Sequence, residues 1–131
     1  MSEKRTIGQN TIISENVIVG ENVIIGHNCV IEENVVLGDN VYIDSNTIIR
    51  RDVTLKEGTM IGEYLMDFCI DHQYHKHPLV IGKNSLIRSG SIIYGDSVIG
   101  DNFQTGHQVT IRENAKIGDY VSIGTLSDIQ G

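Results

Sequence analysis

The sequence contains no tryptophan and a single proline, a scarcity that is unusual for a globular domain. The same chain has 14 glycines and is rich in isoleucine, valine and asparagine. Since β-branched residues favour strands while glycine and asparagine favour tight turns, the composition predicts many short strands joined by corners. No Pro-rich or Ser-rich stretch divides the chain, so we treat residues 1–131 as one domain.

Basic residues are also scarce. Ten Lys and Arg face 17 Asp and Glu, which gives a net charge of −7 and argues against a nucleic-acid partner. The first residues, MSEKRTIGQN, lack the apolar stretch of a signal peptide, and no apolar run approaches the roughly 20 residues that cross a bilayer. We therefore expect a cytoplasmic protein with no membrane partner. Cys29 and Cys69 form neither a disulfide framework nor a CxxC motif, so reduced thiols are expected.

A six-residue repeat dominates what is present. Every sixth residue from Ile7 to Ile61 is aliphatic, and the repeat resumes in a shifted register from Ile81 to Ile129, with Thr105 as the exception. Three residues after most of these aliphatics comes Asn or Gly, the residues that best tolerate a positive φ. In most units the next position holds a smaller residue that can share the interior. Each unit therefore predicts a short strand followed by a corner.

The six-residue spacing is incompatible with a helix, whose apolar positions recur at three and four residues. Three units close a triangular coil of 18 residues, and successive coils stack at the strand spacing of about 4.8 Å. The sequence thus predicts an all-β parallel β-helix in which residues 18 apart are neighbours along the axis.

One interruption, residues 62–80, breaks the repeat and predicts a protruding loop. It concentrates polar side chains: Asp71, His72, Tyr74, His75, Lys76 and His77. Histidines and a carboxylate permit a metal site, and a solvated polar loop is a second interpretation. A third, which we prefer, is a flap over a pocket or a neighbouring subunit, because the loop also carries Tyr64, Leu65, Met66 and Phe68.

The repeat is least regular in the segment NFQTGHQVTIREN, residues 102–114, and such irregularity tends to mark functional sites. Thr105 replaces the inward aliphatic there. Phe103 replaces a smaller residue, although stacking by 18 places it beside Ser85, so packing alone could explain the ring.

His107 follows at the corner of this unit. The same stacking places it between Ser89 and Thr125, and places Gly106 between Arg88 and Gly124. Stacked glycines would leave backbone amides uncovered beside an imidazole. Acyl transfer from a thioester needs that pair: a base to take a proton and an N–H to meet the oxyanion.

The segment TGHQVTIREN resembles the hexapeptide-repeat acetyltransferases, particularly those that modify sugars or nucleotide-linked sugars. The resemblance implies a left-handed coil, His107 as the general base, and acetyl-CoA bound in a groove between subunits of a homotrimer, with no metal required. We expect an acceptor site and a cofactor site around His107. The acceptor residues would be Asp71, His72, Tyr74, Arg88, Asn102 and Gln104, and the cofactor residues Gly106, Gly124 and Thr125.

His27 and Arg112 each have a structural interpretation. His27 occupies the place of His107 in its own unit, but nothing else there departs from the repeat, so we interpret it as an ordinary corner residue. Arg112, like Arg88, should point outward near the edge that carries His107, where it could hold a phosphate or carboxylate of the acceptor or cofactor, and surface solvation is an equal alternative. Arg112 also stacks over Tyr94, and a guanidinium on an aromatic face needs no ligand to explain it.

Two other functions remain open. The γ-class carbonic anhydrases share this scaffold, but their paired histidines lie five residues apart and position 112 is Arg. The sequence also ends in mid-repeat at GTLSDIQG. That predicts either C-terminal coils missing from a longer enzyme, or a short relative that lost part of its cofactor site and serves as a non-catalytic trimeric scaffold.

Overall fold

The structure is a computed structural model that describes residues 5–63 and 78–129, and every regular element in these ranges is a β-strand. The strands form three parallel sheets, here named A, B and C. Sheet A contains β1 (Arg5–Ile7), β4 (Val23–Ile25), β7 (Tyr42–Ile43), β10 (Met60–Glu63), β13 (Ile92–Tyr94), β16 (Thr110–Ile111) and β19 (Asp128–Ile129). Sheet B contains β2 (Ile12–Ile13), β5 (Val30–Ile31), β8 (Thr47–Ile49), β11 (Leu79–Ile81), β14 (Val98–Ile99) and β17 (Lys116–Ile117). Sheet C contains β3 (Ile18–Val19), β6 (Val36–Leu37), β9 (Thr54–Leu55), β12 (Leu86–Ile87), β15 (Gln104–Thr105) and β18 (Ser122–Ile123).

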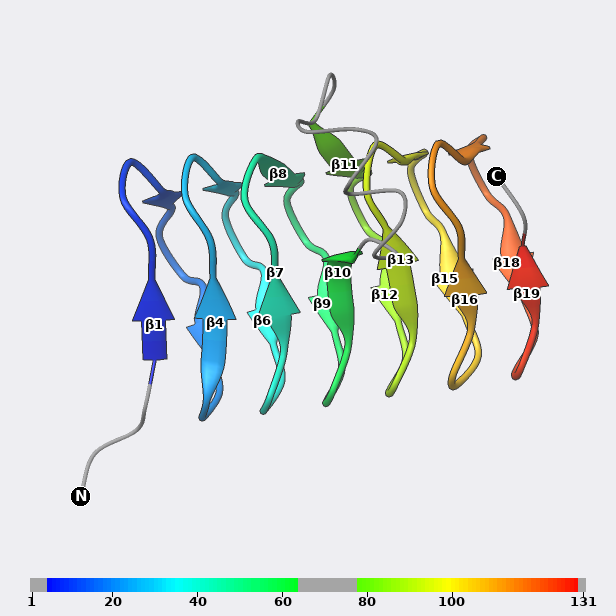
Figure 1. The fold of residues 1–131 in the computed structure, drawn as a ribbon, viewed down its shortest axis with the longest axis horizontal. Helices are drawn as coiled ribbons and strands as arrows, with labels where there is room; N and C mark the ends of the chain where they lie inside the picture. The colour runs from blue at the N-terminus through cyan, green and yellow to red at the C-terminus, as the bar shows by residue number, and fades with distance from the viewer. Residues whose placement is uncertain (1–4, 64–77, 130–131) are drawn as a thin grey trace.

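The chain visits the sheets in the order A, B, C, so each coil has three edges, named AB, BC and CA after the sheets they join. In Figure 1 the strands of sheet A face the viewer and run upward while the coils advance to the right, so the β-helix is left-handed. The predicted fold class is confirmed. The part of the chain that the structure describes has no helix long and apolar enough to cross a membrane.

The register confirms the predicted stacking. Ile25 pairs with Ile43 at the spacing of the repeat, whereas Ile49 pairs with Ile81, which is much farther along the chain. The interruption therefore lengthens one coil without altering the register on either side. The predicted bounds of 62–80 were too wide, because β10 continues through Glu63 and β11 begins at Leu79. An irregularity between Ile61 and Glu63, with Gly62 at a φ of 98°, allows β10 to continue beyond the usual corner.

The repeated aliphatics fill the interior. From Ile25 to Ile111 these side chains are at most 1% exposed, whereas Ile7 in the first coil is 45% exposed. Burying one such side chain stabilises the fold by about 1.5 to 3 kcal/mol. Smaller buried residues sit beside them, and some polar ones are satisfied locally: the Thr47 hydroxyl donates to the Asp44 carbonyl at 2.8 Å.

The corners use the predicted left-handed conformation. Asn28 is typical: its φ is 58°, and its amide donates to the Gln9 carbonyl of the preceding coil at 2.9 Å. Asparagine tolerates this conformation, which costs most other residues about 1 to 2 kcal/mol. The Asn positions with positive φ are residues 10, 16, 22, 28, 34, 40, 46, 84, 102 and 114.

Candidate functional site

His107 lies on the CA edge between β15 and β16, and its side chain is exposed. Its amide donates to Thr125 Oγ1 at 3.1 Å, and its carbonyl accepts from the Leu126 amide at 3.0 Å. The adjacent Gln108 amide donates to the Ser89 carbonyl at 2.9 Å, so the predicted position between Ser89 and Thr125 is confirmed. Among the described residues the imidazole itself has no hydrogen-bond partner. The backbone is therefore fixed on both sides while the ring nitrogens are free.

His27, at the equivalent place on the AB edge, differs. Its Nδ1 accepts the Gln9 amide proton at 2.7 Å, and its own amide donates to Ser45 Oγ at 2.9 Å. An imidazole whose ring nitrogen accepts a backbone N–H is held in one orientation. The structure thus gives His27 the corner role predicted for it, and the contrast with His107 is a difference in hydrogen bonding.

The expectation of uncovered amides was wrong for Gly106. Its amide donates to the Ile123 carbonyl at 2.7 Å, within the ladder that joins the last two coils. A Cβ at this position would lie 2.5 Å from the Thr125 nitrogen, so glycine is required there by the close approach of the next coil. At Gly124, by contrast, no atom of the described residues lies within 4 Å of the Cβ position, apart from its chain neighbours. The Gly106 N–H is consequently committed to the fold and cannot serve an oxyanion without loss of a coil-to-coil bond.

The irregularity at Thr105 has a local explanation. In other coils the backbone bonds directly across this position, as Lys56 does to the Ile87 carbonyl at 2.9 Å. The Arg88 amide instead donates to the Thr105 hydroxyl at 3.0 Å, and Arg88 Nη1 donates to the Thr105 carbonyl at 2.9 Å. At Thr105 the hydroxyl therefore replaces the backbone carbonyl as the acceptor of the Arg88 amide. The carbonyl is then available to accept from the Arg88 guanidinium, which is held close to His107.

The predicted site residues fall into three groups. Arg88, Gly106 and Thr125 adjoin His107 on the CA edge, and Gly124 stacks in the next coil of that edge. Gln104 is exposed on sheet C, whereas Asn102, with a φ of 58°, lies at the BC edge across that sheet. The remaining three, Asp71, His72 and Tyr74, lie outside the described residues.

The insertion that contains those three leaves the solenoid at the AB edge, between β10 of sheet A and β11 of sheet B. His107 is on the CA edge, so sheet A separates it from the strand ends that carry the insertion (Figure 1). The described part of the chain therefore does not bring the base of the loop to the His107 corner.

Two packing predictions are confirmed. Phe103 is fully buried, and its amide donates to Ser85 Oγ at 3.2 Å, which places the two residues beside each other in adjacent coils. Arg112 Cζ lies 5.2 Å from the centre of the Tyr94 ring, with Nε 3.4 Å from Glu113 Oε1. The ring of Phe103 is thus explained by its burial and the Arg112 guanidinium by its stacking on Tyr94, while Arg112 Nε is buried with no hydrogen-bond partner among the described residues.

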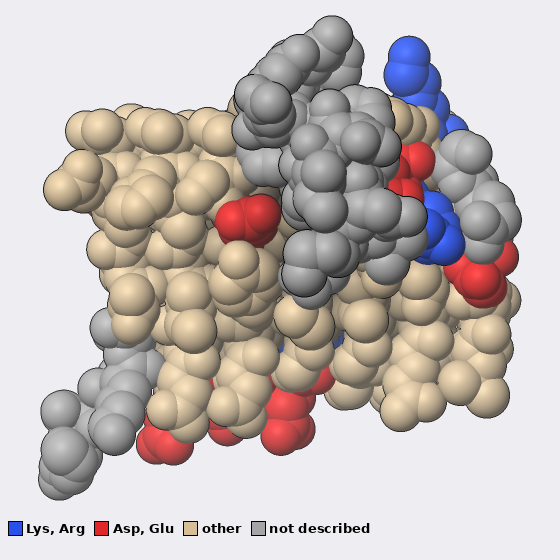
Figure 2. Space-filling model, viewed as in Figure 1, with Lys and Arg blue, Asp and Glu red and all other residues tan. Residues whose placement is uncertain are grey.

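The charges along the CA edge are uneven. In the first coils its corner residues are acidic (Glu21, Asp39 and Glu57), and Figure 2 shows acidic side chains along the lower edge of the molecule in this part. The later corners carry the uncharged residues Ser89 and Thr125 on either side of His107. An anionic ligand of the His107 corner would therefore be repelled from the first coils.

Within residues 5–63 and 78–129, no three His, Cys, Asp or Glu side chains gather closely enough to hold a metal ion. His27 and His107, the histidines of these ranges, lie on different edges. The loop histidines proposed as metal ligands lie outside the described residues.

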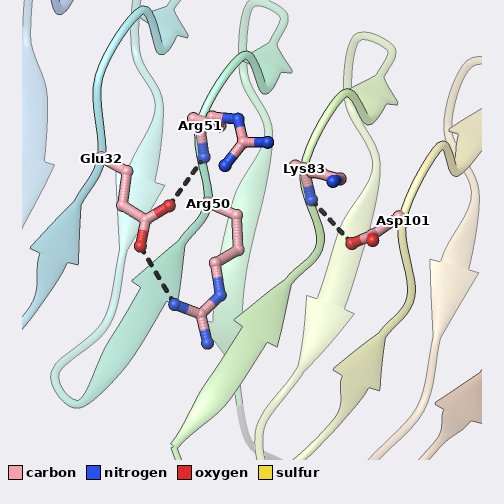
Figure 3. Close-up of polar contacts among 5 residues, drawn as sticks. All are labelled: Glu32, Arg50, Arg51, Lys83 and Asp101. Atoms are coloured by element: carbon pink, nitrogen blue, oxygen red, sulfur yellow. Dashed lines mark hydrogen bonds and ion pairs between the residues drawn. The ribbon is translucent and has the colours of Figure 1, made fainter.

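A basic corner on the BC edge was not among the predictions from sequence. An open pocket of about 300 Å³ lies there, lined by Glu32, Arg50, Arg51, Lys83 and Asp101 (Figure 3). The regular spacing of the repeat conceals that Arg51 and Lys83 are neighbours, because the insertion lies between them in the sequence. Allowing for the extra length of the insertion would have revealed the pair.

The three sheets define a class, the left-handed parallel β-helix of hexapeptide repeats. Residues 21–114 match the family described as the GMPPB C-terminal domain. The chain belongs to this family.

Among known proteins, an acyl-(acyl-carrier-protein)–UDP-N-acetylglucosamine O-acyltransferase from Campylobacter concisus is 32% identical over an alignment of 88 residues, and the match covers 60% of this chain and 34% of that protein. The chain thus spans about a third of that relative's length. Among solved structures, the acetyltransferase domain of PglB from Neisseria gonorrhoeae is 17% identical with a TM-score of 0.48, covering 88% of this chain and 51% of that one. Perosamine N-acetyltransferase from Caulobacter crescentus, solved with CoA and GDP-perosamine, is 16% identical with a TM-score of 0.41, covering 96% and 58%.

Proposed function

We propose that this chain is a CoA-dependent acyltransferase that moves an acetyl group to an amino or hydroxyl group of a sugar or nucleotide-linked sugar. The observation that carries the proposal is the exposed His107 imidazole, which has no partner among the described residues while hydrogen bonds to Thr125 and Leu126 fix its backbone. The acyltransferase that is 32% identical over 88 residues supports acyl transfer as the reaction type.

In the proposed reaction His107 takes the proton from the acceptor nitrogen or oxygen as that atom attacks the thioester carbonyl. The carbon–sulfur bond then breaks, and the imidazolium returns its proton to the departing thiolate. Histidine is the side chain most often used as a general base, and positioned acid–base catalysis of this kind contributes about 10²- to 10⁴-fold in rate.

Arg88 is the proposed partner of this base. Only its Nη1 and its backbone amide are used by Thr105, so other guanidinium N–H groups remain to hold a phosphate or carboxylate of the acceptor. Because Gly106 N–H is bonded to Ile123, the negative charge on the thioester oxygen has to be met by another donor.

A homotrimer is part of the same proposal. The outward side chains of sheet B form an aliphatic row of Ile12, Val30, Ile48, Val80 and Val98, of which Ile12 is 62% and Val98 40% exposed. An apolar row on a flat sheet favours association with a second copy. Light scattering on the purified chain should give three times the mass of the 14.5 kDa chain.

The decisive experiment combines calorimetry with acetyl-CoA and turnover of amino sugars for the wild type, His107→Ala and His27→Ala. We expect all three to bind acetyl-CoA, and His107→Ala to lose about 10²- to 10⁴-fold in turnover. His27→Ala is the matched control, since it removes a corner imidazole whose Nδ1 holds the Gln9 amide and should affect stability rather than rate. Equal turnover of His107→Ala and wild type would contradict the assignment of the base.

The engaged Gly106 amide favours a second candidate, a non-catalytic trimeric scaffold, because it removes one expected part of a catalytic corner. The same experiment separates the two. A trimeric wild type that does not bind acetyl-CoA supports the scaffold and contradicts the enzyme.

A further inference from the structure

The BC edge carries an unusual order of charges. One corner position recurs in successive coils, and hydrogen bonds between coils fix its order: the Asp52 amide donates to the Glu33 carbonyl at 3.1 Å, and the Asn84 amide to the Arg51 carbonyl at 3.1 Å. The residues at this position are Glu15, Glu33, Arg51, Lys83, Asp101 and Asp119. The two cations therefore lie in adjacent coils, with two acidic residues in the coils before them and two in the coils after them.

The two carboxylates that line the pocket, Glu32 and Asp101, bind backbone amides or Arg50 and not the charged ends of Arg51 and Lys83. Glu32 Oε1 accepts the Arg51 amide proton at 3.0 Å, and Glu32 Oε2 pairs with Arg50 Nη1 at 3.0 Å. Asp101 Oδ1 accepts the Lys83 amide proton at 3.1 Å (Figure 3). These bonds hold the backbone of both coils, but they do not neutralise the charged ends of Arg51 and Lys83.

Those charged ends are poorly paired. Arg51 Nε lies 3.8 Å from Asp52 Oδ2, and both side chains are about half exposed, at 50% and 42%. Within the described ranges no ion pair involves the Lys83 ammonium. Figure 3 shows the Arg51 guanidinium turned toward Lys83, at the open pocket of about 300 Å³. Like charges in adjacent coils, which stack about 4.8 Å apart, repel each other. An anion placed between Arg51 and Lys83 would reduce this repulsion.

We propose that this basic corner binds a diphosphate group. The guanidinium of Arg51 offers a planar fork of donors that matches one phosphate, and the ammonium of Lys83 supplies a point charge for the second. Arg50, tied to Glu32, adds positive charge at the rim of the pocket. The lining of the pocket has three cations and two carboxylates, Glu32 and Asp101, so positive charge is in excess there although the whole chain has a net charge of −7.

The position suits a ligand that extends toward His107. Lys83 precedes β12 at the BC edge, and Ser89, beside His107, follows β12 at the CA edge. Six residues of extended chain span at most about 20 Å. Diphosphates occur both in CoA and in nucleotide-linked sugars. Which of these molecules supplies the diphosphate rests on the proposed function, whereas the site itself does not.

Binding of inorganic pyrophosphate, measured by calorimetry and by thermal melting, tests the site without relying on activity. The variants are Arg51→Gln/Lys83→Gln and, as the matched control, Lys116→Gln, which removes an exposed cation from β17. We expect pyrophosphate to raise the melting temperature of the wild type and the control, and the double variant to bind at least about tenfold more weakly, the effect of 1.4 kcal/mol. Without pyrophosphate the double variant should melt no lower than the wild type, because the repulsion is gone.

Absence of pyrophosphate binding to the wild type at millimolar concentration, or equal binding by the double variant, would overturn the proposal. Competition by CoA and by uridine diphosphate then identifies the source. Displacement by CoA assigns the corner to the donor, and displacement by uridine diphosphate alone assigns it to the acceptor. Displacement by neither overturns the nucleotide assignment. His107→Ala should retain full pyrophosphate binding, so failure of the catalytic proposal is distinguishable from failure of this one.

Discussion

Replacing Gly106 with alanine tests how tightly the coils are stacked beside His107. The added Cβ would lie 2.5 Å from the Thr125 nitrogen and 2.8 Å from its Cα, distances at which backbone has to move. The φ of Gly106 is outside the left-handed region, so the cost is steric rather than conformational. Overpacking of this kind typically costs about 1 to 3 kcal/mol, and backbone on both sides places Gly106→Ala near the upper end.

Gly124→Ala is the matched control, because this glycine occupies the equivalent place one coil later. Apart from its chain neighbours, none of the residues that the structure describes has an atom within 4 Å of its Cβ position. There the substitution only reduces the freedom of the unfolded chain, which stabilises by about 0.4 to 1 kcal/mol. The loss at Gly106 and the gain at Gly124 add, so the two variants should differ by about 3 to 4 kcal/mol in the free energy of unfolding.

Urea unfolding followed by far-ultraviolet circular dichroism provides the assay, since the chain has no tryptophan to report by fluorescence. Adding Thr125→Gly to Gly106→Ala should recover only part of the loss, because the clash with the Thr125 backbone remains. If Gly106→Ala and Gly124→Ala unfold within about 0.5 kcal/mol of each other, the close stacking at this corner is refuted.

Three further predictions concern the corners and the core. Asn40→Ala should lose about 1 kcal/mol of unfolding free energy, because its φ of 61° is unfavourable for alanine, while Asn40→Gly should lose less; urea unfolding of both variants checks this. Phe103→Ala should cost about 3 to 5 kcal/mol because the ring is fully buried, and a loss below about 1 kcal/mol in the same assay would contradict its packing role. Burial raises the pKa of the Cys29 thiol from 9.0, so in a Cys69→Ser background a thiol reagent should react only after denaturant is added. Because the unfolded thiol loses its proton first, the unfolding free energy should fall as the pH rises above 9.0, and it should fall less in Cys29→Ala.

The fold was predictable from sequence because a solenoid is governed by local periodicity. Ile25 and Ile43 pair as their spacing requires, and the Asn corners adopt the backbone conformation that their side chains favour. Because the hydrophobic pattern, the turn residues and the packing all favour the same structure, the fold of such a sequence can be predicted.

The candidate site was less predictable because it depends on which hydrogen bonds the stacked coils use. Sequence spacing placed Gly106 next to the following coil but could not show that its amide bonds to the Ile123 carbonyl. The same spacing could not distinguish His27 from His107, whose difference lies in the bond from the Gln9 amide to a ring nitrogen. Arg51 and Lys83 were missed because stacking by 18 residues does not apply across the insertion, where the paired residues Ile49 and Ile81 are farther apart in the sequence.

The insertion between β10 and β11 has a consequence for engineering. β10 pairs with β7 and β13, and β11 pairs with β8 and β14, in the register that an uninterrupted coil would have. The length of chain at this corner is therefore independent of the pitch of the β-helix. A foreign peptide or a small domain could be grafted there with its two ends on one coil, and the flanking strands would still pair as they do now. The corner between β10 and β11 is thus a position at which the β-helix could display a grafted peptide.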